Sequence, residues 1–134
     1  MITSYQSNRI IDGQFGSVSN SIPANLYFGL STTAPSFDGT GATEPSGNAY
    51  ARVTVANNKT SFTSAALGII TNAISITFPE STGSWGTITY CLIYDASTAG
   101  NLMYYEALPV SRAVPTLTTV LFAVGALSVQ MNNT

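Results

Sequence analysis

Apolar and polar residues alternate with a period of two through most of this sequence, and this alternation restricts the fold more than any other feature. It is clear at residues 26–30, 50–55 and 73–78, where Pro79 ends the last run. Because successive side chains of a β-strand point to opposite faces, the pattern predicts half-buried strands. No segment shows the period of an amphipathic helix. We therefore expect no helix longer than about two turns, and about two-fifths of the chain or more in strands.

Residues 87–95 are apolar on both sides of the run. A strand covered on both faces lies either at the centre of a sheet or beneath a neighbouring subunit. Residues 95–101 have the composition of a turn, so residues 102–108 are predicted to return as the hairpin partner. The heaviest burial is expected at eight positions, namely Ile74, Ile76, Phe78, Ile88, Tyr90, Leu92, Leu127 and Val129.

Three further runs complete the pattern. Residues 62–70 are ambiguous and hold at most one irregular strand, whereas residues 118–124 and 127–131 flank Gly125, which suits a bulge or a corner. About seven or eight short strands with frequent turns predict an all-β protein, a single-domain β-sandwich or small barrel with mainly antiparallel strands. This domain is expected to span residues 23–134.

Residues 1–22 lie outside the alternating pattern and are expected to form an N-terminal arm or edge segment. They mix the apolar residues Ile10, Ile11 and Phe15 with Ser, Asn, Gln and Gly. Two readings are equally supported: an arm that becomes ordered against a partner, or a frayed terminus or first edge strand. Three apolar side chains are too few for a core. The arm reading therefore predicts that deleting residues 1–20 weakens partner binding and spares the thermal stability of the sandwich.

Two aromatic side chains complete the candidate interface. Phe37 is the one aromatic residue of the long loop at residues 31–48, and such loops are often contact elements. Trp85 precedes the run that is apolar on both sides. It is either an exposed anchor or a cap on the core, and the cap is the commoner arrangement. The candidate protein-interface residues are therefore Ile10, Ile11, Phe15, Phe37 and Trp85.

The low charge of the chain favours assembly. Only 7% of residues are charged, against about 25% in an ordinary soluble domain, and the net charge is −2. Repulsion between copies is therefore weak, and we expect a symmetric homo-oligomer, with a trimer favoured. The four basic residues are scattered singly, the longest apolar run is far shorter than a membrane span, and no secretion signal is visible. Nucleic-acid binding and membrane insertion are not expected.

Catalysis can be tested by elimination. The chain has no histidine and one cysteine, Cys91, which removes His-based acid–base chemistry, thiolate metal clusters and internal disulfides. Among the six carboxylates, Asp38 and Glu44 flank a glycine-rich loop but are a weak signal for calcium. A glycosidase needs two acids, so it remains a remote alternative in which Asp95 or Glu106 faces another acid across a cleft. We expect no enzyme activity, no cofactor and no metal site.

Several short strings resemble one known family. They are Leu26-Tyr27-Phe28-Gly29-Leu30-Ser31-Thr32, Tyr50-Ala51-Arg52, Trp85-Gly86-Thr87-Ile88, Ile93-Tyr94-Asp95-Ala96, Gly100-Asn101-Leu102 and Phe122-Ala123-Val124-Gly125-Ala126-Leu127-Ser128-Val129. In order and spacing this set resembles small virion proteins of tailed bacteriophages that are labelled tail-fibre-like or decoration-like. The sequence departs from that family at Leu117-Thr118, where members often have Gly-Asp, so the turn geometry there stays open. The first twenty or so residues carry no resemblance.

The resemblance implies a structural virion protein with no catalytic residues to transfer. The favoured interpretation is a capsid decoration (cement) protein on the capsid surface, which is made in the host cytoplasm and binds the major capsid protein or other virion proteins, usually as a trimer. Low charge, small size and an arm-like N-terminus suit that role. The alternative is a tail or tail-fibre protein, possessing a receptor-facing surface marked by an aromatic-lined glycan groove.

Overall fold

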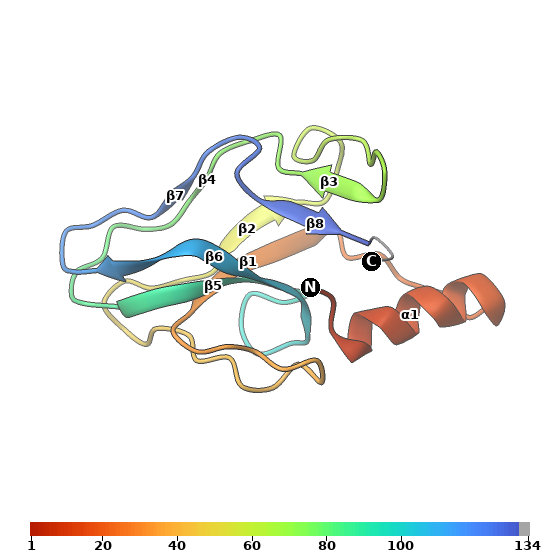
Figure 1. Ribbon diagram of the computed structural model, residues 1–134, viewed down its shortest axis with the longest axis horizontal. Helices are drawn as coiled ribbons and strands as arrows, with labels where there is room; N and C mark the ends of the chain where they lie inside the picture. Colours follow the sequence, from red (N-terminus) through yellow and green to blue (C-terminus); the bar gives the residue numbers. More distant parts are fainter. Residues whose placement is uncertain (132–134) are drawn as a thin grey trace.

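The computed structural model describes residues 1–131, which contain one helix and eight strands (Figure 1). The elements are α1 (Ser4–Phe15), β1 (Asn25–Ser31), β2 (Val53–Ala56), β3 (Ile69–Thr71), β4 (Ile76–Thr77), β5 (Gly86–Tyr94), β6 (Leu102–Val114), β7 (Leu121–Phe122) and β8 (Ser128–Gln130). The sheets are antiparallel and, within the described residues, none closes into a barrel. The prediction of an all-β domain is confirmed. The strand content is about a third, below the two-fifths expected, because β4 and β7 are only two residues long.

A four-stranded sheet in the order β2-β1-β5-β6 forms the centre of the molecule. β5 pairs with β1 on one side and with β6 on the other, so the run that is apolar on both sides lies inside the sheet as predicted. Phe28 of β1 lies opposite Ile93 of β5, and Leu30 lies opposite Cys91. These pairs place apolar side chains from neighbouring strands on the same face.

Both faces of this sheet are covered. On one face, Phe28, Leu30 and Ile93 belong to the main core, which also includes Ile76 and Phe78 of the β4 region. The short pairs β3–β8 and β4–β7 form the second layer over that face, above the sheet in Figure 1. On the other face a second cluster is covered by the loop that follows β1, which lies below the sheet in Figure 1. This second cluster consists of Leu92, Tyr94, Leu102 and Tyr105, with Ala42 of the loop packed against it.

Asn72 holds the second layer together through a buried side-chain amide. Its Nδ2 donates to the carbonyls of Ile74 and Ala123 at 2.8 Å each, and its Oδ1 accepts from the backbone of Leu127 at 2.9 Å. The chain turns at Gly125, which has a φ of +76°. Because a buried amide is costly unless its hydrogen bonds are made, these contacts fix the turn between β7 and β8 against the end of β3.

The burial expectations are confirmed at four of the eight positions. Ile76, Phe78, Ile88 and Leu92 are at most 2% exposed. Three others, Tyr90, Leu127 and Val129, are half-buried. The expectation for Ile74 is wrong, since its side chain is 37% exposed. The reason is that β4 begins only at Ile76, so the alternation at residues 73–78 extends beyond the paired strand.

The expectation of no helix beyond two turns is also wrong, because α1 has 12 residues. The helix begins after Thr3, whose hydroxyl accepts from the backbone of Gln6 and donates to the carbonyl of Leu102 at 2.6 Å. Thr3 and Gln6 have the Ser/Thr-x-x-Glu/Gln spacing of a capping box, a signal in the sequence that predicts a helix start here. Just before the cap, Ile2 pairs with Tyr104, so residues 1–3 continue the sheet at the edge of β6.

Candidate interaction surfaces

Helix α1 rests on the sheet by only one side and projects beyond it (Figure 1). Tyr5 donates to Asp95 at 3.1 Å, and Gln6 donates to the hydroxyl of Tyr104 at 3.3 Å. These hydrogen bonds fix the first turn, but no residue of α1 is fully buried. The candidate Ile10 is half-buried, whereas the more distal residues of the helix are exposed except Gly13.

The exposed end of α1 is apolar and carries one acid. Ile11 is 55% exposed, Phe15 is 88% exposed, and Val18 just beyond the helix is 58% exposed. Asp12 is exposed between them. We call these four residues the α1 tip. Exposed apolar side chains gathered at one end of a helix are typical of an interaction surface, whereas single apolar residues scattered over a surface are common in any protein.

A groove of about 460 Å³ runs between α1 and the sheet. Its apolar residues include Leu26, Phe62 and Val129, and two cations, Arg9 and Lys59, also line it. Arg9 donates to Gln6 Oε1 at 3.1 Å and to the Ser21 carbonyl, and Lys59 donates to the Thr63 carbonyl at 2.9 Å. All of these acceptors are neutral, and no carboxylate lines what we call the α1 groove within residues 1–131. The groove therefore combines apolar walls with two positive charges that no acid neutralises.

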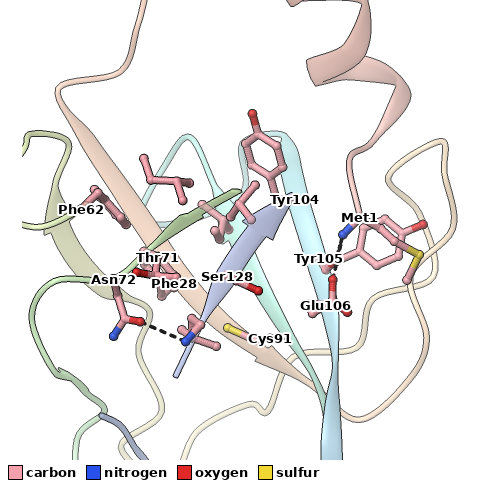
Figure 2. Close-up of a pocket in the computed structure, with 14 residues that line it drawn as sticks. Met1, Phe28, Phe62, Thr71, Asn72, Cys91, Tyr104, Tyr105, Glu106 and Ser128 are labelled. Carbon is pink, nitrogen blue, oxygen red and sulfur yellow. Dashed lines mark hydrogen bonds and ion pairs between the residues drawn. The ribbon is translucent and has the colours of Figure 1, made fainter. Parts of the chain in front are cut away.

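A smaller cavity of about 40 Å³ lies between the sheet and the β3–β8 pair (Figure 2). Phe28, Phe62 and Cys91 line it, and Figure 2 shows the Cys91 sulfur between them and the edge residues Tyr105 and Glu106. Burial raises the pKa of the Cys91 thiol to about 12. A space of this size holds at most one or two water molecules, so it is a packing gap in the core.

The two aromatic candidates have different surroundings. Trp85 is 4% exposed, its indole N–H donates to the Asn48 carbonyl at 2.8 Å, and its ring meets Tyr50 edge-on. This position agrees with a cap on the core. Phe37 is 59% exposed, and its carbonyl accepts from the backbone of Ser4 at 2.7 Å. Phe37 and the start of α1 therefore lie side by side, although the sequence separates them by more than thirty residues.

A partly buried ion pair joins Glu44, in the loop after β1, to Arg52, which belongs to one of the resemblance strings. Glu44 accepts three hydrogen bonds from Arg52, the shortest at 2.6 Å, and one from the Tyr50 hydroxyl at 2.6 Å. The guanidinium also lies 3.4 Å from the ring centre of Tyr94. A Cβ added to Gly29 would meet Glu44 Oε1 at 2.7 Å, so a larger residue there would displace the carboxylate. These motif residues stabilise the fold, and no pattern in the sequence indicates that Glu44 is their partner.

The carboxylates that could have supported catalysis make local structural contacts. Asp38 accepts from Thr40 in its own turn, and Glu106 bonds to the amino group of Met1. Asp95 accepts from the backbone and side chain of Asn101. Partial burial by itself raises the pKa of Asp95, but these hydrogen bonds and that from Tyr5 outweigh it and hold the pKa below its usual value. No group of three or more metal-ligating side chains is present in residues 1–131.

The domain is small and antiparallel, its helix has an exposed apolar end, and its candidate carboxylates bind groups of the same chain. These features are typical of a protein that acts through contacts with other proteins. Residues 1–130 match the family described as podophage GP4 fiber I protein gp80, and the chain belongs to that family. It is thus a structural virion protein of the tailed-phage type. The match includes the first twenty residues, in which none of the short strings that resemble the phage family lies. Among curated proteins, none matches the sequence. The helix found in the described residues is too short and too polar to cross a membrane.

Proposed function

We propose that this protein is a non-catalytic structural subunit of a phage tail fibre. The observation that carries the proposal is the family match over residues 1–130, since the family is described as a fibre protein. The fold is in keeping with this role: one small rigid domain presents an apolar helix end to its surroundings. The capsid decoration hypothesis rests on low charge and an arm-like N-terminus, and both features are equally compatible with a fibre protein.

The partners proposed are other virion proteins and further copies of the same chain. Only 7% of the residues are charged, which gives little repulsion between neighbours. Phe37 lies beside the first residue of α1, which its carbonyl binds, whereas the α1 tip lies at the other end of that helix. Of the candidate interface residues, Ile11, Phe15 and Phe37 are exposed enough to be contacted without any change in the fold.

The location is tested by labelling purified phage particles with an antibody against the protein, or by imaging particles that carry a tagged copy. We expect the label at the tail. A label distributed over the capsid shell would establish the decoration role instead and overturn the fibre proposal. Particles lacking the protein serve as the control for background labelling.

The absence of catalysis is tested separately, by incubating the protein with host surface polysaccharide and measuring released reducing ends. We expect none. Hydrolysis that is lost in Asp95→Asn or Glu106→Gln but kept in Glu80→Gln, an exposed acid in the loop after β4, would show a carboxylate-dependent glycosidase and contradict the proposal.

A further inference from the structure

We propose that the α1 tip of one copy docks in the α1 groove of a second copy, so that copies associate head to tail. The inference deepens the proposed function by naming the two surfaces through which fibre subunits would meet. Both surfaces belong to the same chain, and each supplies what the other lacks.

The α1 tip and the α1 groove both carry apolar side chains. Phe15 is 88% exposed and Ile11 is 55% exposed, and the two are four residues apart, so they lie on one side of the helix. The α1 groove has a volume of about 460 Å³ and is lined by Leu26, Phe62, Val129 and other apolar side chains. An amphipathic helix that places i and i+4 anchors in an apolar groove is a recurrent mode of protein recognition.

The second match is electrostatic. Asp12 lies between the two apolar anchors and is exposed. The α1 groove carries Arg9 and Lys59, neither of which forms an ion pair within the described residues. A carboxylate entering beside these cations gains charge-assisted hydrogen bonds, and an acidic lining that would repel it is absent from the groove in residues 1–131. Docking of the α1 tip therefore brings unlike charges together.

The tip cannot fill the groove of its own chain. Arg9, which lines the groove, and Asp12 belong to one continuous helix, and Phe15 stands at its far end. An α-helix rises about 1.5 Å per residue and does not fold back on itself, so the distance between the groove and the tip is fixed. The occupant must come from another molecule.

In a head-to-tail arrangement each copy uses its tip on one neighbour and its groove on another, so the contact is heterologous, and repeated contacts close into a ring when the rotation between copies allows it.

The experiment measures self-association of the full chain by sedimentation velocity over a range of concentrations. We expect an oligomer for the wild type and at least about a tenfold loss of association for each of Phe15→Ser, Asp12→Lys and Lys59→Glu. The double variant Asp12→Lys/Lys59→Glu restores unlike charges across the same contact, so it is expected to regain association. Leu67→Ser, which removes an apolar side chain that is 96% exposed elsewhere, is the matched control and should associate like the wild type.

The three substitutions are expected to leave the fold intact, so a loss of association reports on the contact itself. All three substituted side chains are exposed, and a lysine in the last turns of a helix interacts favourably with the helix dipole. Circular dichroism should therefore match the wild type for every variant. A wild type that stays monomeric at high concentration, or an oligomer that none of the three substitutions weakens, would overturn the inference. Because association is measured in solution, it can succeed or fail independently of where the protein lies on the particle.

Discussion

Arg52 joins three separate segments of the chain through one guanidinium group. It forms an ion pair with Glu44 in the loop after β1, and its Nη1 donates to the carbonyls of Ala96 and Ala99 in the β5–β6 turn at 2.7 and 2.8 Å. Its side chain is only 7% exposed. Burial alone would lower the pKa of Arg52, but the hydrogen bonds and charge of Glu44 outweigh it, so the pKa is raised and the group stays charged.

Substituting Arg52 with methionine is therefore expected to be strongly destabilising. The change leaves Glu44 without its counter-charge and two turn carbonyls without a donor. Because the Glu44 side chain is 21% exposed, the cost should lie near or below the lower end of the about 3–5 kcal/mol of a fully buried pair. The midpoint of urea unfolding reports the loss. Arg112→Met, at an exposed position in β6, is the matched control and should change stability by less than about 0.5 kcal/mol. Equal effects of the two substitutions would show that the network does not stabilise the fold.

Cys91 makes the stability depend on alkaline pH. Burial raises the pKa of its thiol to about 12, whereas in the unfolded chain a cysteine thiol has a pKa of about 8.5. Between these values the unfolded state releases a proton that the folded state retains, so stability is full below the lower pKa and falls as pH rises. We expect wild type to lose up to about 1.4 kcal/mol per pH unit more than Cys91→Ala in this window. Urea unfolding of both proteins at several pH values checks this, and identical slopes would refute it.

At the scale of secondary structure, the sequence predicted β1 and β5 closely and missed α1. The period of two at residues 26–30 survives in β1 because its side chains are fixed by pairing on both sides. α1 has no comparable apolar stripe: its apolar residues are few and none is fully buried, and its cap bonds to the distant Leu102. A helix held at one end by tertiary hydrogen bonds leaves little hydrophobic periodicity, and only the capping-box spacing indicates it.

The outer strand β6 has features that hinder pairing with strands of other molecules. Its first part is covered by residues 1–3, but residues 106–113 are mostly exposed. Between Ala107 and Arg112 the register with β5 shifts, and Pro109 lies within this bulge. Bulges and proline on an edge strand prevent it from adding strands of other molecules.

Replacing Pro109 with threonine is expected to promote aggregation, because the substitution adds an N–H group to an exposed edge. Light scattering during incubation of concentrated protein should rise faster than for the wild type. Ser111→Thr places the same residue in the same bulge without adding a donor and is expected to behave like the wild type. No difference between the two variants would show that proline does not protect this edge.

At the scale of the whole molecule, the all-β class and the central strand followed from the alternating pattern, but the candidate surfaces did not follow fully. Ile10, Ile11 and Phe15 were proposed because three apolar side chains are too few for a core, and Phe37 because it is the one aromatic residue of a long loop. Of these four, Ile11, Phe15 and Phe37 are exposed. Arg9, Lys59 and Val129 come from distant parts of the chain. They meet only once β1, β5 and β8 are packed, so no local spacing can reveal the groove.

The deletion of residues 1–20 now has a different expected result. Thr3 is fully buried and binds Leu102 and Met103, and Ile2 pairs with Tyr104, so these residues belong to the folded sheet. Their removal exposes Met103, which is 1% exposed in the intact chain. We expect the deletion to lower Tm by several degrees, because about 1 kcal/mol shifts the midpoint by 2–8 °C in domains of this size. An unchanged Tm in a thermal melt would instead support the hypothesis that residues 1–20 form a separate arm.

The same pairing has a consequence for how the chain folds during synthesis. Thr3 binds residues that are 99 and 100 positions further along, and β1 must wait for β5 before its second neighbour exists. At a translation rate of about 5–20 residues per second, the segments that become the sheet stay unpaired for about 5 s or longer. Contacts between residues so far apart in sequence also form slowly after release. Soluble yield should therefore depend on the speed of translation and on the chaperones of the host.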